Sequence, residues 1–386
     1  MSAFQIDGTQ LGNLAACYFY SYMLMQIPAG ILLDKFGPRK STTIAIVVCA
    51  IGALCFGQAY SLAMAEFGRF LMGAGASFAA LNCLKLIANW FPAKRFAFMA
   101  GLMMTLGMLG AVGGQAPLSA FIEMLGWRTS IEVIAVIGFI LASLFWLVVR
   151  DAPAHHTSFK LNPQKGSFIT SCKGVFGNPQ GWWLSVYSGL AFAPVSVFGG
   201  LWGVPFLAQY YNLSHTLAAN HVSMIFIGFA VGAPIFGWLS DRIGRRKIVM
   251  VIGTAFAFIA CTLVLLLPPL PLALLTILMF GFGFFISSFL LCFTMIREIN
   301  APILAATAVG FMNAFDAMFG AVSDPLTGKF LDMGWAGALE NGARIFPTSV
   351  YKMALLSLPA FLLLAIGCLV FIKDTYCKSV HADPLP

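Results

Sequence analysis

Long runs of hydrophobic residues follow one another along the chain, each about the length needed to cross a lipid bilayer. About 20 apolar residues in a helix span the roughly 30 Å hydrocarbon core of a membrane. The pattern predicts eleven membrane helices, separated by short polar loops. They cover residues 11–33, 42–60, 63–88, 96–122, 129–149, 183–206, 219–239, 247–267, 272–294, 303–323 and 351–372. A longer polar stretch at 151–182 divides them into two blocks.

The composition excludes a soluble protein. Hydrophobic residues make up 60% of the 386 residues and charged residues 9%, whereas soluble domains carry about 25% charged residues. The mean hydropathy is +0.89. We therefore expect an all-α polytopic membrane protein with the lipid bilayer as its surroundings.

The net charge of +8 is unevenly distributed among the loops. If residues 34–41 face the cytoplasm, sixteen of the 22 lysines and arginines fall on that side and four on the opposite side. Cytoplasmic loops of membrane proteins are enriched in cations. The basic balance therefore indicates orientation, and we expect no nucleic-acid partner.

Parts of the first block recur in the second. The loop residues Gly30, Asp34, Lys35, Gly37, Arg39 and Lys40 return 207 positions later as Gly237, Asp241, Arg242, Gly244, Arg246 and Lys247, with Arg245 as an additional cation. Gly110-Ala111-Val112 returns as Gly320-Ala321-Val322. Repeated halves are the architecture of secondary transporters. We expect two helical bundles, at residues 1–150 and 183–386, joined by a cytoplasmic loop at 151–182.

The doubled loop motif resembles the signature of the major facilitator superfamily, which stands there between the second and third helices and again between the eighth and ninth. Arg69, Gly73 and Gly75 are similar to that family's fourth-helix pattern. The resemblance implies two pseudo-symmetric bundles with twelve helices in all. Only one span precedes Asp34 here, so we expect eleven helices, with the family's first helix missing.

A weaker resemblance points to phagosomal nutrient transporters of intracellular bacteria and to lysosomal dipeptide carriers of animals. It rests on residues 26–30, 114–118, 126–128 and 201–205. Gln115 stands where the fifth-helix signature of drug and proton antiporters needs proline, which argues against a drug exporter. The resemblance implies a transporter in a bacterial inner membrane. It would move an amino acid, short peptide or similar small solute by alternating access, by proton symport or facilitated diffusion. Proton-coupled export, a non-transporting sensor and a channel remain alternatives.

The sequence shows no pattern typical of an enzyme. P-loop, HExxH, G-x-S-x-G and CxxC patterns are all absent. We therefore expect no catalytic residues, no cofactor and no metal site. The expected partners are a small-molecule solute, together with protons if transport is coupled, and the chain is expected to be a monomer.

The loop motif places an acid at the end of a helix in each half. Asp34 and Asp241 can pair with the cations that follow them or face the positive N-terminus of a neighbouring helix. The family resemblance implies that such a contact latches the state closed to the inside, with Asp34 near a helix start around Asn300. The alternative is a loop that only fixes topology. Gly30 and Gly237 would permit close helix approach in either case.

Three charged residues fall inside one predicted span. Glu66 lies three positions before Arg69, so the two share a helical face and can neutralise each other. Arg69 is either a coupling or substrate residue, as the family pattern implies, or part of a structural pair. Lys85 either extends to the cytoplasmic surface or binds a substrate carboxylate.

Asp316 lies thirteen residues into its span, hence about 20 Å along the helix. Asn313, Gly320 and Asp324 extend a polar stripe that should face the other half or a wet cavity. Asp316 is either a coupling or substrate site or a structural interhelix hydrogen bond. Gln115 and Asp324 precede Pro-Leu at corresponding places and are further candidates. The resemblance to the superfamily, whose helices at these positions border the central path, implies three more side chains that line the cavity: Tyr22, Gln26 and Trp202.

Overall fold

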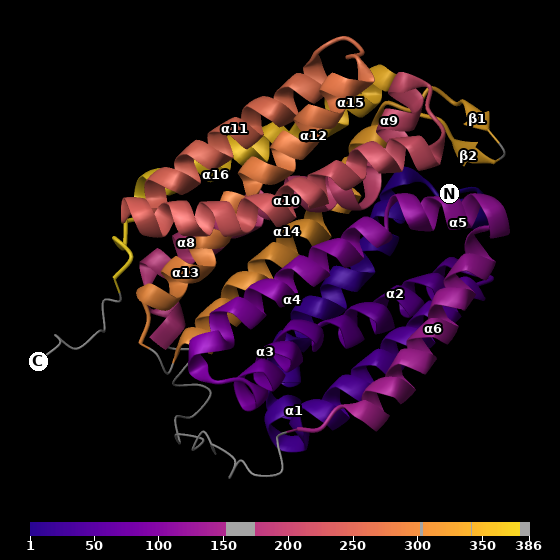
Figure 1. Cartoon of the computed structure of the whole chain (residues 1–386). Helices are drawn as coiled ribbons and strands as arrows, with labels where there is room; N and C mark the ends of the chain where they lie inside the picture. The colour runs from indigo at the N-terminus through magenta and orange to yellow at the C-terminus, as the bar shows by residue number, and fades with distance from the viewer. Residues whose placement is uncertain (152–173, 302–303, 341, 379–386) are drawn as a thin grey trace, which may run out of the picture.

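A computed structural model describes residues 1–151, 174–301, 304–340 and 342–378. Figure 1 shows a chain made almost entirely of helices in two groups. The first group contains α1 (Gly8–Gly57), α2 (Leu62–Ala76), α3 (Ala79–Trp90), α4 (Ala93–Gly113), α5 (Ala116–Leu125) and α6 (Trp127–Val148). The second contains α8 (Pro179–Pro194), the π-helix η2 (Val195–Trp202), α9 (Gly203–Tyr211), α10 (His215–Ile243), α11 (Arg246–Leu266), α12 (Leu272–Ile286), α13 (Leu291–Glu298), α14 (Ala305–Met333), α15 (Thr348–Leu355) and α16 (Ser357–Phe371). Short 3-10 helices lie at Ser2–Phe4 and Ser287–Leu290.

The predicted all-α membrane fold is confirmed. Nine helical stretches among the described residues are long and apolar enough to cross a membrane, and they coincide with nine of the eleven predicted spans. The other two predicted spans correspond to the first arm of α1 and to α14. The strands β1 (Leu339–Glu340) and β2 (Ala343–Arg344) form a small antiparallel pair that the hydrophobic pattern did not indicate.

The loop-motif glycines end helices in both halves. Gly37 has φ +78°, which divides α1 into two arms, and Gly244 has φ +71° at the C-cap of α10. Glycine adopts this left-handed region without the steric cost that a Cβ would bring. The repeated motif therefore encodes a repeated turn. We call the end of the bundles that carries these turns the loop-motif face, and the opposite end, which carries Gly8 and Met333, the N-terminal face.

Three of the helix pairs between the halves make extensive contacts. The first arm of α1 lies beside α14, and α10 packs against α4 and α5 (Figure 1). Glycines bring α1 and α14 into backbone contact: a Cβ at Gly12 would lie 2.4 Å from the Asp324 carbonyl oxygen, and one at Gly328 would lie 2.1 Å from that of Gly8. Small residues at such crossings allow membrane helices to pack closely.

The two halves differ in one respect. In the second half, α8 packs against both α14 and α16. In the first half, the described helix that packs extensively against both α4 and α6 is α5, which lies between them along the chain. A Cβ at Gly320 of α14 would meet Ser196 and Phe19, but one at the matching Gly110 of α4 would meet no atom within 4 Å. The expected absence of one helix from the first half stays a prediction. The second half begins with α8 at Pro179, and most of the expected central loop lies outside the described residues.

Candidate functional site

A cavity of about 230 Å³ lies between the two halves. Helices α1 and α2 of the first half and α8, η2, α10 and α14 of the second supply its walls. The lining residues are Ala15, Tyr18, Phe19, Arg69, Phe192, Val195, Ser196, Gly200, Leu201, Phe226 and Asp324. Most of this wall is apolar. The two charged lining residues, Arg69 and Asp324, come from opposite halves.

Arg69 projects from α2 into this cavity. One guanidinium nitrogen donates to the Ala15 carbonyl oxygen at 3.2 Å, and the group lies 5.3 Å from the centre of the Tyr18 ring. The structural pair with Glu66, one of the two alternatives, is not formed in this state: Glu66 accepts a hydrogen bond from Asn13 at 3.0 Å, and no ion pair joins these two described residues. A guanidinium carries five N–H donors. Arg69 therefore keeps donors available for a ligand.

Asp324 faces the same cavity from α14. It is 2% exposed, and its Oδ1 atom has no hydrogen-bond partner among the described residues. No ion pair within 4 Å joins it to Arg69, although both groups are described. A buried carboxylate oxygen without a partner is costly in a stable core. The cavity therefore presents one cation and one acid that do not neutralise each other by direct contact.

The three side chains predicted to line the cavity are not among its lining residues. Trp202 is 1% exposed and donates from Nε1 to the Asp324 carbonyl oxygen at 3.3 Å, so the prediction that it lines the cavity is wrong. Tyr22 stacks on Tyr18 and accepts a hydrogen bond from Asn313 of the other half at 3.2 Å. The Nε2 atom of Gln26 is buried with no partner among the described residues.

The polar stripe of α14 divides between two surroundings. Asn313 and Asp324 face the first half, whereas Asp316 is 6% exposed and accepts a hydrogen bond from Ser188 of α8 at 2.6 Å. The expectation that Asp316 faces the other half or a wet cavity is therefore wrong, because its position on α14 turns it toward α8. Its contact is the interhelix hydrogen bond of the structural alternative. Gln115 does join the halves, donating to the Gly199 carbonyl oxygen at 2.6 Å.

The first copy of the loop motif is anchored to the end of α6. Arg39 donates from its side chain to the Trp146 carbonyl oxygen at 2.6 Å and from its backbone N–H to Asp151 at 2.7 Å. Lys85 donates to the Leu33 carbonyl oxygen at 3.3 Å, so it lies at the loop-motif face. The two remaining motif lysines, Lys35 and Lys40, are exposed. The side chain of Asp34 lies outside the part of the chain that the structure describes.

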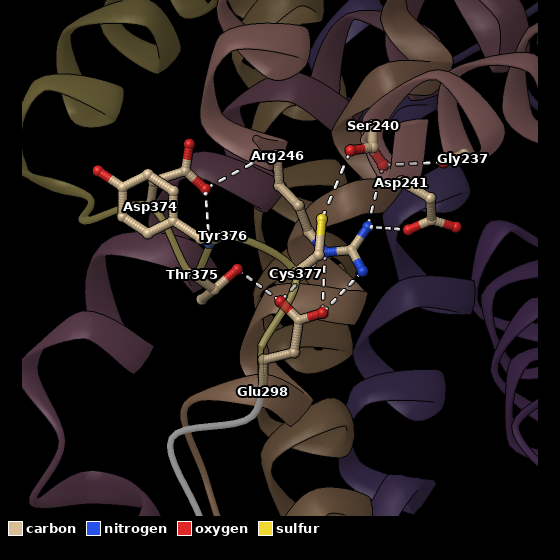
Figure 2. A network of polar contacts seen from close by, with 9 residues as sticks. All are labelled: Gly237, Ser240, Asp241, Arg246, Glu298, Asp374, Thr375, Tyr376 and Cys377. Atoms are coloured by element: carbon tan, nitrogen blue, oxygen red, sulfur yellow. Dashed lines mark hydrogen bonds and ion pairs between the residues drawn. The ribbon is translucent and has the colours of Figure 1, made fainter. Parts of the chain in front are cut away.

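The second copy forms the network shown in Figure 2. The Arg246 guanidinium donates to Glu298 at 2.7 Å and to Asp241 at 3.0 Å, so the local pairing expected of Asp241 is present. Asp374 accepts from the Arg246 backbone N–H at 3.2 Å. Burial raises the pKa of the Cys377 thiol, which therefore stays protonated and donates to the Ser240 carbonyl oxygen.

The two remaining cations of this copy rest on aromatic rings. Arg242 lies 5.2 Å from the centre of the Trp238 ring, and Arg245 lies 5.8 Å from that of Tyr376. Both side chains are exposed. They therefore contribute surface charge rather than buried contacts.

Sequence reasoning missed the acids that hold the motif. Asp151 and Asp374 each follow the last helix of their half by three residues, and each accepts from the backbone N–H of the equivalent motif arginine. The repeated Val149-Arg150-Asp151 and Ile372-Lys373-Asp374 would have revealed them. The close helix approach that Gly30 and Gly237 would permit is not made in this state, because a Cβ at either would meet no described atom within 4 Å.

The repeated halves and the cavity between them agree with a comparison against known families. The sequence profile of the Major Facilitator Superfamily matches residues 1–204 and again residues 188–376. The chain belongs to this superfamily. It is therefore an integral multi-pass membrane protein of a transporter family and not an enzyme.

Several relatives of the chain carry the names of transporters. It is 28% identical over 199 residues to the nitrate/nitrite transporter NrtP of Picosynechococcus, covering 44% of this chain and 37% of that one. It is 25% identical over 282 residues to the uncharacterized transporter YybO of Bacillus subtilis, covering 66% and 64%. A probable L-galactonate transporter of Escherichia coli is 21% identical over 348 residues, covering 85% and 76%. The chain thus spans less than two thirds of the length of the first two relatives.

Solved structures show the same fold. A bacterial homolog of the human lysosomal transporter Spinster, inward-facing and unoccupied, superposes with a TM-score of 0.77 at 18% identity, covering 96% of this chain and 90% of that one. The nucleoside transporter NupG superposes with a TM-score of 0.67 at 16% identity, covering 95% and 91%. These likenesses support the two-bundle architecture.

Proposed function

We propose that the protein is a secondary active transporter of a small carboxylate-bearing solute. The observation that carries this proposal is the cavity between the halves, with Arg69 in its wall and a single hydrogen bond from its guanidinium group to the described residues. Guanidinium groups bind carboxylates through paired, charge-assisted hydrogen bonds. A site that both bundles build is exposed to either side of the membrane in turn when the bundles rock about it.

The hydrogen bonds between the halves support the alternating-access part of this proposal. They join the bundles near the N-terminal face, through Gln115 and Gly199 and through Glu123 and Thr216, and reach inward as far as Tyr22. At the loop-motif face the hydrogen bonds of Arg39 and Arg246 remain within their own halves. The excess of cations assigns that face to the cytoplasm. On this assignment the structure corresponds to a carrier closed to the outside.

The solute class follows from the charge of the cavity. Arg69 favours an anionic group, and the apolar rest of the wall favours a compact organic body. Relatives named for nitrate, L-galactonate, sulfoacetate and galactarate transport share an anionic solute. Amino acids and short peptides, which the sequence resemblance favours, also carry a carboxylate.

Asp324 provides a physical reason for proton symport. Its carboxylate shares the cavity with Arg69, so its negative charge would repel an anionic solute that binds there. A proton on Asp324 removes that repulsion, which makes solute binding and proton binding favour each other. Asp316 is less suited to this role, because Ser188 holds it inside the second half.

The proposal is tested by ligand-induced stabilisation of the purified protein. A panel of amino acids, dipeptides and sugar acids is compared with matched amides and alcohols that lack the carboxylate. We expect carboxylates alone to raise the unfolding temperature, and Arg69→Gln to abolish the rise. Arg128→Gln is the matched control, because Arg128 donates to the Ala59 carbonyl oxygen away from the cavity. Equal stabilisation of the Arg69→Gln variant, or by the amides, would refute the proposed solute class.

A further inference from the structure

An acid at the end of α14 binds the start of α1 at the N-terminal face. The Oδ1 atom of Asp332 accepts from the Gly8 backbone N–H at 2.8 Å, and Oδ2 accepts from that of Thr9 at 2.7 Å. The Thr9 hydroxyl donates to the same Oδ2 atom at 2.6 Å. These three hydrogen bonds cross between the halves. Arg344, in β2 of the second half, completes the group with an ion pair to Asp332 of 3.0 Å.

The contact uses the helix start in a specific way. The first N–H groups of a helix lack partners within the helix and form its positive end, which favours a carboxylate. Asp7 already caps α1 from its own half by accepting from the Gln10 N–H at 2.8 Å. Asp332 takes the two N–H groups that Asp7 leaves, at Gly8 and Thr9. The side chain of Asp332 is 15% exposed, so water screens these bonds only in part.

Backbone packing at the same place depends on the halves being closed. A Cβ at Gly8 would lie 2.9 Å from the Gly328 carbonyl oxygen, and Gly328 in turn faces the Gly8 carbonyl. Glycines therefore allow α1 and α14 to approach until the Asp332 carboxylate reaches the helix start. A rocking motion that opens the N-terminal face would break this backbone packing and the Asp332 hydrogen bonds at the same time.

We propose that Asp332 is a gating residue, the latch that holds the N-terminal face closed. The inference rests on the proposed alternating-access function and adds to it the residue that sets the balance between states. The family resemblance implies a corresponding latch at Asp34 of the loop motif, which lies at the other end of the first arm of α1. Two latches at opposite ends of one antiparallel helix pair would close alternately as the bundles rock. Each would then stabilise one state of the cycle.

The test measures opening without any solute. Ser196, which lines the cavity, is replaced by cysteine in the full chain freed of its own cysteines. A membrane-impermeant maleimide is then added from the side of the N-terminal face. Asp332→Asn should raise the labelling rate at least about fivefold, because it removes the charge from three hydrogen bonds between the halves. Thr9→Val, which removes one of them, should give a smaller rise.

The control is Asp7→Asn, which removes an acid from the same helix start without touching a bond between the halves. It should leave the labelling rate unchanged. Unchanged labelling of a well-folded Asp332→Asn variant would overturn the latch, as would equal rises for Asp332→Asn and Asp7→Asn. Folding is checked by the unfolding temperature of each variant. Because no solute enters the assay, failure of the latch is distinguishable from failure of the proposed transport.

Discussion

At the scale of single residues, the chemistry of the cavity depends on two charges that do not meet. Arg69 contacts a backbone oxygen and the ring of Tyr18, while one carboxylate oxygen of Asp324 has no partner among the described residues. A direct ion pair would have satisfied both groups and left little for a ligand. Their separation instead leaves a cation for a solute and an acid for a proton.

Replacement of Asp324 tests the proton role. In proteoliposomes, wild-type solute uptake should rise as the pH falls on the side of entry, because protonation of Asp324 removes a negative charge that repels the anion from the cavity. Asp324→Asn mimics the protonated group, so its uptake should change little with pH. Asp316→Asn should keep the wild-type pH profile, because Asp316 bonds to Ser188 away from the cavity. A flat profile for Asp316→Asn with a normal one for Asp324→Asn would reverse the two assignments.

At the scale of elements, a buried arginine ties three helices of the second half together. Arg246 begins α11 and binds Glu298 at the end of α13 and Asp241 near the end of α10. Its side chain is 8% exposed and that of Glu298 13%, so this pair is shielded from water. The second copy of the loop motif therefore stabilises the packing of α10, α11 and α13.

Loss of this pair should destabilise the protein. Glu298→Gln removes one charge and leaves Arg246 buried with weaker partners, which costs about 3–5 kcal/mol when a buried pair is broken. Arg242→Gln, at an exposed motif position, should cost less than about 0.5 kcal/mol. Thermal unfolding in detergent compares the two. Equal unfolding temperatures would show that the network adds little to stability.

The membrane helices could be predicted from the sequence because apolar runs of bilayer length have few alternatives, and the doubled motif indicated the two bundles. Side-chain partners could not be predicted in this way. Helix periodicity placed Glu66 and Arg69 on one face. In the folded chain, however, Glu66 accepts a hydrogen bond from Asn13, and Arg69 lines the cavity. Asp332 was missed because its partners, Gly8 and Thr9, lie more than 300 residues away along the chain.

At the scale of the whole molecule, the halves touch in a manner that suits a carrier. Hydrogen bonds between them extend from the N-terminal face to Tyr22 and Asn313, and a cavity lies between the bundles. Among the described residues the two halves differ in packing: a Cβ at Gly320 would meet Ser196 and Phe19, whereas one at Gly110 would meet no atom within 4 Å. Rocking of two such bundles gives alternating access, whereas a channel would need a continuous path.

Solute counterflow is the most direct test of the central claim. Proteoliposomes loaded with an excess of an unlabelled carboxylate that stabilises the protein receive a trace of the same compound, labelled, outside. A carrier should accumulate the label transiently, and Arg69→Gln should abolish the accumulation while Arg128→Gln keeps it. Stabilising ligands that never exchange across the membrane, or accumulation that does not depend on Arg69, would contradict transport through this cavity.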